Sequence, residues 1–442
     1  MNALYNIRLR TISPLHIGTG RLLTSVGEFV STGSSVNIID QPALNKLLAS
    51  REGLLQRYLN HIIEKQENAN VFQFFKDEAI DGEIKYSRKL PLHAQGFDPE
   101  SNNMLELMID TDGGKYIPGS SIKGALRTLL FAAEILKDSM LKKKINDIVM
   151  SPGIDLYHIK KKVEDVEKNL FQNDMMNLIV RDSQLFSEHD ICVEIAKREH
   201  LFGVDTTGLD SLRECVAKDA ETDFEIAAEK TFINPSLHFF NQVNAIRVLF
   251  ALINKVTQKH IEFELELLRH STHRSAQSIK NELISIQKRI EEERNEYAYF
   301  RLGKGKSFYF IVILPFLEDQ ARQKVLQLMK IESSSQATYP KTRVLNDSNE
   351  MYGWVQLGFE EEKAAEVPLS NNNVEELIIN ETELTARYVS EKLVCIMING
   401  TRLENVQLVN KFKKQLVTGE DIKVLVAQIT KEGRLNQVKL TT

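Results

Sequence analysis

The sequence predicts an α+β protein with more than one folded unit. Its 442 residues exceed what one hydrophobic core ordinarily organises, and 42% of them are hydrophobic. Segments that alternate between apolar and polar residues, as strands do, are separated by segments with apolar residues at helical spacing. The order strand, helix, strand recurs in two parts of the chain. This order favours α+β sandwiches over a doubly wound sheet.

The composition is typical of a protein that stays in the cytosol. The formal net charge is −5, which argues against a protein that coats nucleic acid over its whole surface but permits local basic grooves. No apolar run approaches the ~20 residues of a membrane span, so we expect no membrane contact. The three cysteines are far apart and form no C-x-x-C pair. A disulfide framework is therefore not expected.

The first element is a half-buried strand over residues 4–12. Ile7 and Leu9 share one face of this alternating segment, and Arg8 and Arg10 share the other. The strand therefore has a basic outer face.

The strand leads into the loop "SPLHIGTG", Ser13 to Gly20, which Arg21 follows. His16 lies in this loop beside several arginines, and such a histidine could act as a general acid or base. No second catalytic group is evident in the sequence. The alternative is a structural histidine that is hydrogen-bonded to the loop backbone.

The segment "YIPGSSIKGALRTLLF" joins a turn to an amphipathic helix. Ser120 or Ser121 could cap this helix, and Lys123 and Arg127 share a face near its start. Free amides at a helix N-terminus, together with two cations, form a site for one or two phosphates. The alternative is an ordinary helix cap.

Glycine loops with adjacent cations recur at "HIGTGR" and at "RLGKGK", Arg301 to Lys306. The latter is no P-loop, because Phe300 replaces the first glycine and a strand-like segment follows. The segment also partly matches an RNA-recognition motif, through Lys306, Phe308 and Phe310. The alternative is a core strand with aromatic packing. Three such loops on two α+β units suit a nucleic-acid backbone bound between them.

Metal binding has little support in the sequence. His270 and His273 in "HSTH" lie three residues apart, without the cysteines or third histidine of a zinc site. We expect a solvated helix there and no metal.

The composition changes over residues 359–373, which are acidic and then rich in proline, serine and asparagine, as in a linker. Several short strands with tight turns follow over residues 374–442. They predict a small β-barrel of the OB or S1-like kind. Within the preceding chain, we place one unit at residues 1–198 and a second at residues 199–358.

The motifs "LRTISPLHIGTG", "YIPGSSIKGALRTLL", "VRDSQLF", "RLGKGKS" and "YPKTRVL…GWVQL" occur in an order that resembles the RAMP superfamily of type III CRISPR systems. Within this superfamily the chain is most similar to the subunit at the head of the type III-A (Csm) effector backbone. The motifs are spread over residues 1–358, and "YIPGSSIKGALRT" is the most specific of them.

The resemblance implies two ferredoxin-like (RRM-like) domains with helical insertions. It also implies a non-catalytic, antiviral subunit that caps the backbone filament, contacts the 3′ part of the guide RNA (crRNA) and the target RNA, and assists guide maturation without cutting. Its partners would be the other type III subunits, above all the repeated backbone subunit, and it would need no cofactor. The candidate RNA-binding residues are Arg8, Arg10, His16, Gly18, Gly20, Arg21, Gly119, Ser120, Ser121, Lys123, Arg127, Arg301, Gly303, Lys304, Gly305 and Lys306.

Three alternatives remain open from the sequence. One is an endoribonuclease of the same superfamily that processes guide RNA, with His16 as its general base or acid. Another is a different RAMP subunit, from a type III-B complex. The last is a scaffold that binds only proteins, through the C-terminal barrel.

Overall fold

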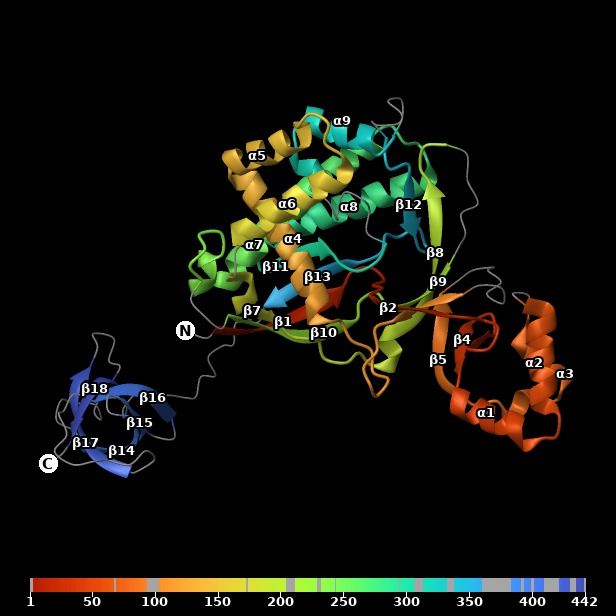
Figure 1. The fold of residues 1–442 in the computed structure, drawn as a ribbon, viewed down its shortest axis with the longest axis horizontal. Coiled ribbons are helices and arrows are strands. Elements are labelled where there is room, and N and C mark those ends of the chain that lie inside the picture. The colour runs from red at the N-terminus through yellow and green to blue at the C-terminus, as the bar shows by residue number, and fades with distance from the viewer. Residues whose placement is uncertain are drawn as a thin grey trace. The chain divides into compact units, whose positions relative to one another are not determined.

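A computed structural model describes residues 3–66, 69–93, 103–171, 174–203, 211–228, 232–242, 244–293, 295–305, 313–331, 338–359, 383–390, 393–398, 401–408, 421–429 and 435–440. The chain divides into two units, Met1–Glu360 and Glu361–Thr442. The elements of both units are labelled in Figure 1. No helix in the described ranges is long and apolar enough to cross a membrane.

The first sheet of the larger unit is built around the N-terminal strand. Its order is β11 (Tyr297–Arg301), β13 (Trp354–Phe359), β1 (Ala3–Thr11), β10 (Glu221–Ala228) and β7 (Leu178–Val180). All neighbours are antiparallel, with Ile7 opposite Phe224 and Leu9 opposite Leu357. Ile7 and Leu9 are fully buried, which confirms the predicted alternation in β1.

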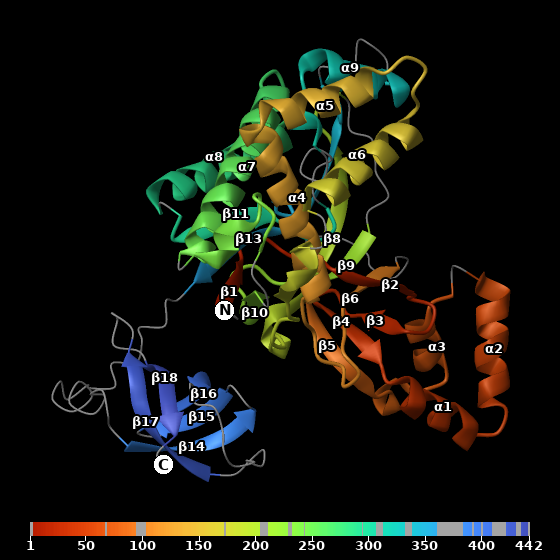
Figure 2. The same ribbon diagram turned by 60° about the vertical axis from the view of Figure 1, so that its left-hand side comes forward.

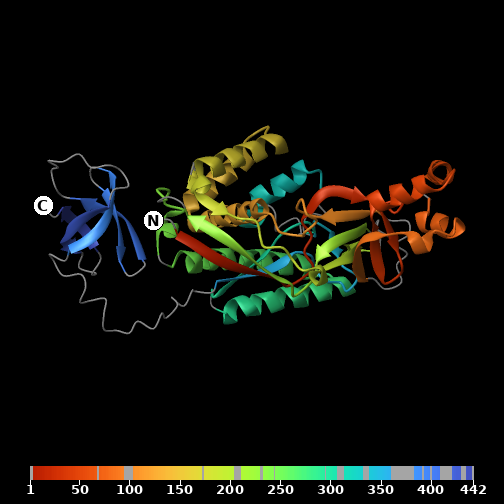
Figure 3. The same cartoon turned by 90° about the horizontal axis from the view of Figure 1, so that it is seen from below.

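Helices cover this sheet on both faces. On one face, α4 (Gly119–Lys137) and α7 (Ala245–Leu268) join the main core with the inward residues of β1. On the other face, α8 (Arg274–Glu292) packs against Tyr299 of β11 and Trp354 of β13. Figure 3 shows α8 (green) on the opposite side of the strand layer from the gold helices of residues 119–171. The part of that second face beyond α8 carries the exposed arginines of β1.

A second sheet stands beside the first. Its strand order is β2 (Gly18–Leu23), β6 (Met104–Leu107), β9 (Ser211–Val216), β8 (Ile191–His200), β5 (Tyr86–His93), β4 (Ser35–Ile39) and β3 (Phe29–Ser31), and β12 (Thr342–Leu345) also pairs with β8. The predicted boundary after residue 198 lies inside β8, and both predicted units contribute strands to each sheet. The division at that residue stays a prediction.

The other helices form two groups. Helices α1 (Gln41–Ser50), α2 (Leu54–Lys65) and α3 (Val71–Asp77) enclose a small core with residues from β3 and β4, and lie beside these strands in Figure 2. Helices α5 (Ser139–Met150), α6 (Leu156–Phe171) and α9 (Asp319–Leu328) pack near α4. Both regions carry apolar residues at helical spacing, as their buried faces require.

A charged cluster is buried around β9 of the second sheet. The fully buried carboxylate of Glu214 accepts from Lys115 Nζ at 3.0 Å and from the backbone N–H of Leu107 at 3.0 Å, and it pairs with Arg88. Burial lowers the pKa of Lys115, and the nearby Glu214 opposes that shift. Because buried charges destabilise a fold unless they are paired, these contacts hold β9 against the loop before α4.

The smaller unit is a closed barrel. Its strand order is β14 (Glu383–Ser390), β15 (Leu393–Ile398), β16 (Thr401–Leu408), β18 (Leu435–Leu440) and β17 (Asp421–Ile429), and β17 pairs again with β14. The β16–β18 pair is parallel and the other pairs are antiparallel. These strands thus form the small barrel that the sequence predicted. Apart from Phe359, which ends β13, the predicted linker lies outside the described residues.

Candidate nucleic-acid interface

Three segments that the sequence analysis singled out meet at one cleft of about 320 Å³. The first loop supplies Ile17, the start of α4 supplies Ser121 and Gly124, and the end of β11 with its following loop supplies Arg301 and Gly303. The remaining lining residues are Ala125, Thr128, Leu129, Thr257, His260, Phe300 and Leu302. The fold therefore brings together loops that lie almost 300 positions apart in the sequence.

The first and the late loop are joined through their backbones. The N–H of Lys304 donates to the carbonyl of His16 at 2.8 Å. Gly303 has a φ of +73°, in the left-handed region, and a Cβ there would overlap the same His16 carbonyl. Only glycine combines this conformation with so close an approach. The late glycine loop, which holds Gly303 and Lys304, thus fixes the position of the first loop, which holds His16.

The side chain of His16 is buried and anchors the first loop to β9 at this junction. It is 1% exposed, and its Nδ1–H donates to the backbone carbonyl of Glu214 at 2.7 Å. A carbonyl only accepts, so the neutral ring carries its proton on Nδ1. Burial lowers the pKa of His16 to about 4; the nearby Arg213 and Lys304 lower it further, and the Glu214 hydrogen bond acts against both. These contacts are those of a structural histidine.

We expect this histidine to make stability pH-dependent. Its pKa is about 4 when folded and about 6.5 when unfolded, so the unfolded chain binds more protons between these values and stability falls as pH falls. From pH 7 to pH 5 the loss from His16 is about 2 kcal/mol. Urea unfolding should show a smaller loss in His16→Asn, whose amide keeps the donor to Glu214. Equal losses would contradict the assignment.

The start of α4 differs from the prediction of a serine cap. Pro118 occupies the capping position, so both serines lie in the first helical turn. The N–H of Gly119 donates to Oδ1 of Asp182 at 2.7 Å, and a Cβ on Gly119 would overlap the Val180 carbonyl. The serine cap is therefore wrong, and the Gly119 amide is already bonded to a carboxylate.

The side chains at the start of α4 include two cations, Lys123 and Arg127. Ser120 is exposed and Lys123 is partly buried. Burial, and then the neighbouring Arg127, lower the pKa of Lys123. Arg127 donates to Glu167 at 2.8 Å. A phosphate bound here would meet Lys123 before Arg127, whose charge is partly balanced.

The arginines of the first strand and loop are also paired with acids. Arg8 pairs with Asp223 at 3.1 Å, and Arg10 pairs with Asp219 at 2.8 Å, on the sheet face opposite α4. Arg21 pairs with Glu28. Such exposed pairs contribute little to stability, but they reduce the positive field at the surface.

The remaining candidate residues shape the loops. Arg301 is 4% exposed and donates to the carbonyls of Tyr352 and Gly305, and burial lowers its pKa to about 10. Gly18 begins β2, and Gly20 and Gly305 have φ values of +88° and +95°. Lys304 is exposed. Lys306, like Phe308 and Phe310, lies outside the described residues.

Arg213 of β9 is a cation that the sequence analysis missed. It is 6% exposed, its guanidinium stacks over the Tyr352 ring at 5.0 Å, and a Cβ on Gly305 would lie 3.1 Å from Nη1. Its Nε and Nη1 make no hydrogen bond to any part of the chain that the structure describes. These two buried nitrogens therefore lack the acceptor that a buried donor normally has. One arginine within a strand gave no local signal in the sequence.

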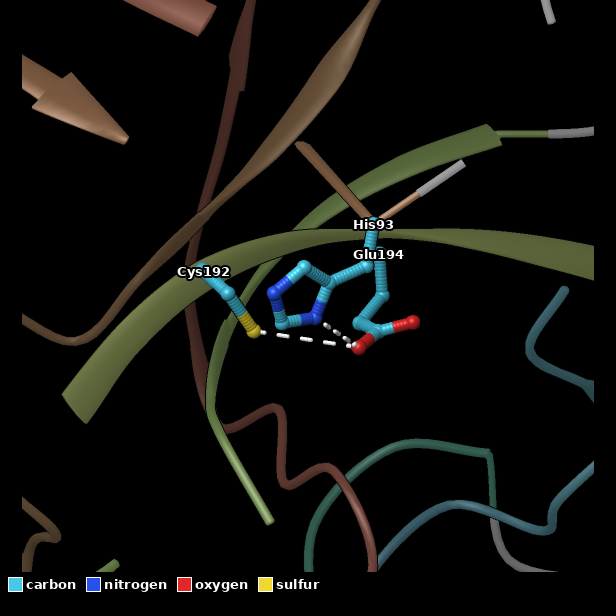
Figure 4. A group of neighbouring side chains, drawn as sticks. All are labelled: His93, Cys192 and Glu194. Carbon is cyan, nitrogen blue, oxygen red and sulfur yellow. Dashed lines mark hydrogen bonds and ion pairs between the residues drawn. The ribbon is translucent and has the colours of Figure 1, made fainter. Parts of the chain in front are cut away.

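Potential metal-binding side chains gather elsewhere in the second sheet. His93, Cys192 and Glu194 place their donor atoms within 4.8 Å of one another (Figure 4). The sequence offered His270 and His273 instead, and His273 caps α8 by accepting from the N–H of Ser275. The spacing of the three clustered residues along the chain gives no recognisable zinc motif.

Comparisons with known proteins find one family and several relatives. The pattern of the family described as "RAMP superfamily" matches residues 8–358. "CRISPR system Cms protein Csm5" of Enterococcus italicus is 30% identical over 166 residues, 32% of this chain and 47% of that protein. The protein of the same name from Streptococcus thermophilus is 30% identical over 136 residues, 28% of this chain and 37% of that protein. The chain thus spans less than half the length of these curated relatives.

Two solved structures share the fold. A chain of the "Cryo-EM structure of Csm-crRNA-target RNA ternary complex in type III-A CRISPR-Cas system" has a TM-score of 0.60 at 20% identity and covers 81% of this chain and 100% of its own. The "Crystal structure of T.onnurineus Csm5" has a TM-score of 0.54 at 19% identity and covers 79% of this chain and 99% of its own. The family and the relatives confirm the resemblance that the sequence motifs predicted.

Proposed function

This chain belongs to the RAMP superfamily, and from that premise we propose that it is a non-catalytic subunit of a type III-A (Csm) CRISPR complex. In this proposal the subunit binds the sugar-phosphate backbone of the guide RNA. The observation that carries the proposal is the meeting of the first loop, the start of α4 and the late glycine loop at one cleft. A guide of variable sequence requires contacts to phosphate and sugar rather than to bases. The lysines beside the cleft could supply such contacts.

The cations Lys123 and Lys304 are the phosphate-binding groups of this proposal. Lys304 is exposed at the late loop, and Arg213 is buried beneath that loop, where its charge adds to the positive field. Both lie close enough to His16 to lower its pKa, which puts them at the junction of two loops. Arg301, His16, Gly303 and the other loop glycines act by holding the loops in position.

The strand connections support the finer assignment of the fold. The antiparallel order β13-β1-β10-β7, with α4 between β1 and β7 and α7 between β10 and β13, fits a ferredoxin-like domain. The barrel order β14-β15-β16-β18-β17, with its parallel β16–β18 pair, fits an OB-like accessory domain. We assign the barrel to a docking role within the complex.

The place of this subunit in the complex follows from the resemblance. We propose that it caps the filament of repeated backbone subunits, contacts the 3′ part of the guide and the target RNA, and assists guide maturation in the cytosol. The relatives named Csm5 and the fold shared with a chain of a Csm–crRNA–target RNA complex support this role.

The contacts of His16 favour binding over catalysis. Its ring is 1% exposed and its Nδ1–H is engaged with the Glu214 backbone. A general base must reach the proton that it removes, and this ring has no exposed path to a ribose hydroxyl. Metal-independent cleavage of repeat RNA that is lost in His16→Ala would overturn the non-catalytic role.

We expect Lys123→Ala with Lys304→Ala to weaken guide-RNA binding by the assembled complex. Each lost phosphate contact should reduce the slope of log affinity against log salt by about 0.7, the value for single strands. Filter binding across a salt series measures both effects. Lys288→Ala is the matched control, since that exposed lysine lies on α8, on the other face of the sheet. An unchanged slope in the double variant would contradict the interface.

A further inference from the structure

Three side chains with different donor atoms meet where β5 and β8 run parallel. His93 ends β5 and stands in register with Glu194 of β8, and Cys192 lies two residues earlier on the same face of β8. The imidazole, thiol and carboxylate atoms all lie within 4.8 Å of one another. Two neighbouring strands of a regular sheet therefore position the cluster.

The donor atoms of His93 and Cys192 both lie close to one carboxylate oxygen of Glu194. His93 Nδ1 lies 3.0 Å from Oε1 of Glu194, and Cys192 Sγ donates to the same oxygen at 3.8 Å (Figure 4). Donor atoms around a tetrahedral zinc ion are about 3.3–3.8 Å apart, as bonds of about 2.0–2.3 Å require. The observed separations need only small side-chain rotations to match.

We propose that His93, Cys192 and Glu194 bind one zinc ion. Imidazole nitrogen, thiolate sulfur and carboxylate oxygen are the donors that zinc takes in proteins, whereas magnesium and calcium prefer oxygen alone. Three protein donors leave a fourth position for water. The ion would tie β5 to β8. None of its three ligands lines the cleft assigned to RNA, so this proposal does not depend on the proposed function.

Burial and charge support the site. The side chain of Glu194 is 5% exposed and Cys192 is 1% exposed, whereas that of His93 is 52% exposed and gives the ion a path from solvent. A thiolate and a carboxylate balance the two charges of zinc, and such a neutral site suits a buried position. Arg213 stands directly opposite Glu194 in the register, yet among the described residues Glu194 pairs with His93. The carboxylate is thus directed toward the other two donors.

The test uses the full-length chain, purified without chelators and with any affinity tag removed. After incubation with zinc and gel filtration, mass spectrometry of the metal should find about one zinc per chain. Cobalt should produce a thiolate-to-metal charge-transfer band in the near ultraviolet. His93→Ala and Cys192→Ser should each lower zinc affinity at least about tenfold, and Cys192→Ser should also remove the cobalt band.

His158→Ala is the control, because His158 is an exposed histidine that also faces a carboxylate, that of Asp155. It should keep the full zinc content and the cobalt band. Because His93 is half-exposed, His93→Ala should fold, and circular dichroism checks this. Zinc that is lost on gel filtration, or a cobalt band that persists in Cys192→Ser, would overturn the proposal.

Discussion

Replacing Gly303 by alanine is expected to destabilise the larger unit by about 3 kcal/mol and to weaken guide-RNA binding at least tenfold. A φ of +73° costs a residue with a side chain about 1–2 kcal/mol. The new Cβ would also overlap the His16 carbonyl, which cannot retreat without breaking its hydrogen bond to the Lys304 amide. Strain and steric overlap therefore add at the point where two loops are joined. Urea unfolding and binding by the assembled complex measure the two effects.

Gly113→Ala is the matched control for that substitution. Gly113 has a φ of +91°, but a Cβ there would meet nothing within 4 Å. The cost should be about 1–2 kcal/mol, with guide-RNA affinity unchanged. If both variants lost the same stability and bound RNA alike, the close contact between the loops would not matter.

Replacing Glu214 by glutamine is expected to lower the free energy of unfolding by about 3–5 kcal/mol. Glutamine keeps the shape of the side chain and an acceptor for the Leu107 N–H, but it removes the charge. Lys115, which is 4% exposed, and Arg88 would then face each other without their shared carboxylate. Urea unfolding at pH 7 measures the loss.

Two further variants separate the charge effect from general damage. Adding Lys115→Met to the glutamine variant removes the uncompensated ammonium and should restore part of the stability. Asp223→Asn makes the same chemical change in the exposed pair with Arg8 and should cost less than about 1 kcal/mol. Similar losses in the buried and exposed pairs would contradict this account.

Much of the fold could be predicted because its surface elements carry clear periodicity. In the strand at residues 4–12, exposed arginines follow the buried Ile7 and Leu9, and the helices near 41–65, 136–170 and 274–292 show apolar stripes. The strands Ile191–His200 and Ser211–Val216 were not predicted. Most of their residues are buried on both faces, so no alternation marks them.

The candidate site was predicted in outline but not in its contacts. Glycines beside cations marked the three loops, and the fold brings these loops together. The partner of the Gly119 amide is Asp182, far along the chain, so local rules pointed to a serine cap instead. Arg213 could not be predicted either, because only the tertiary fold places it under Gly305 and its local sequence gives no signal.

The central position of β1 has a consequence for how the protein is made. Its two neighbours are β10 and β13, which begin at Glu221 and Trp354. During synthesis both edges of β1 stay unpaired until β10 has been made. The edge that pairs with β13 stays unpaired until nearly all of the larger unit has left the ribosome. Such long-range pairing slows folding and exposes apolar surface meanwhile. Nascent chains that stop before β13 should therefore be ready substrates for chaperones and proteases.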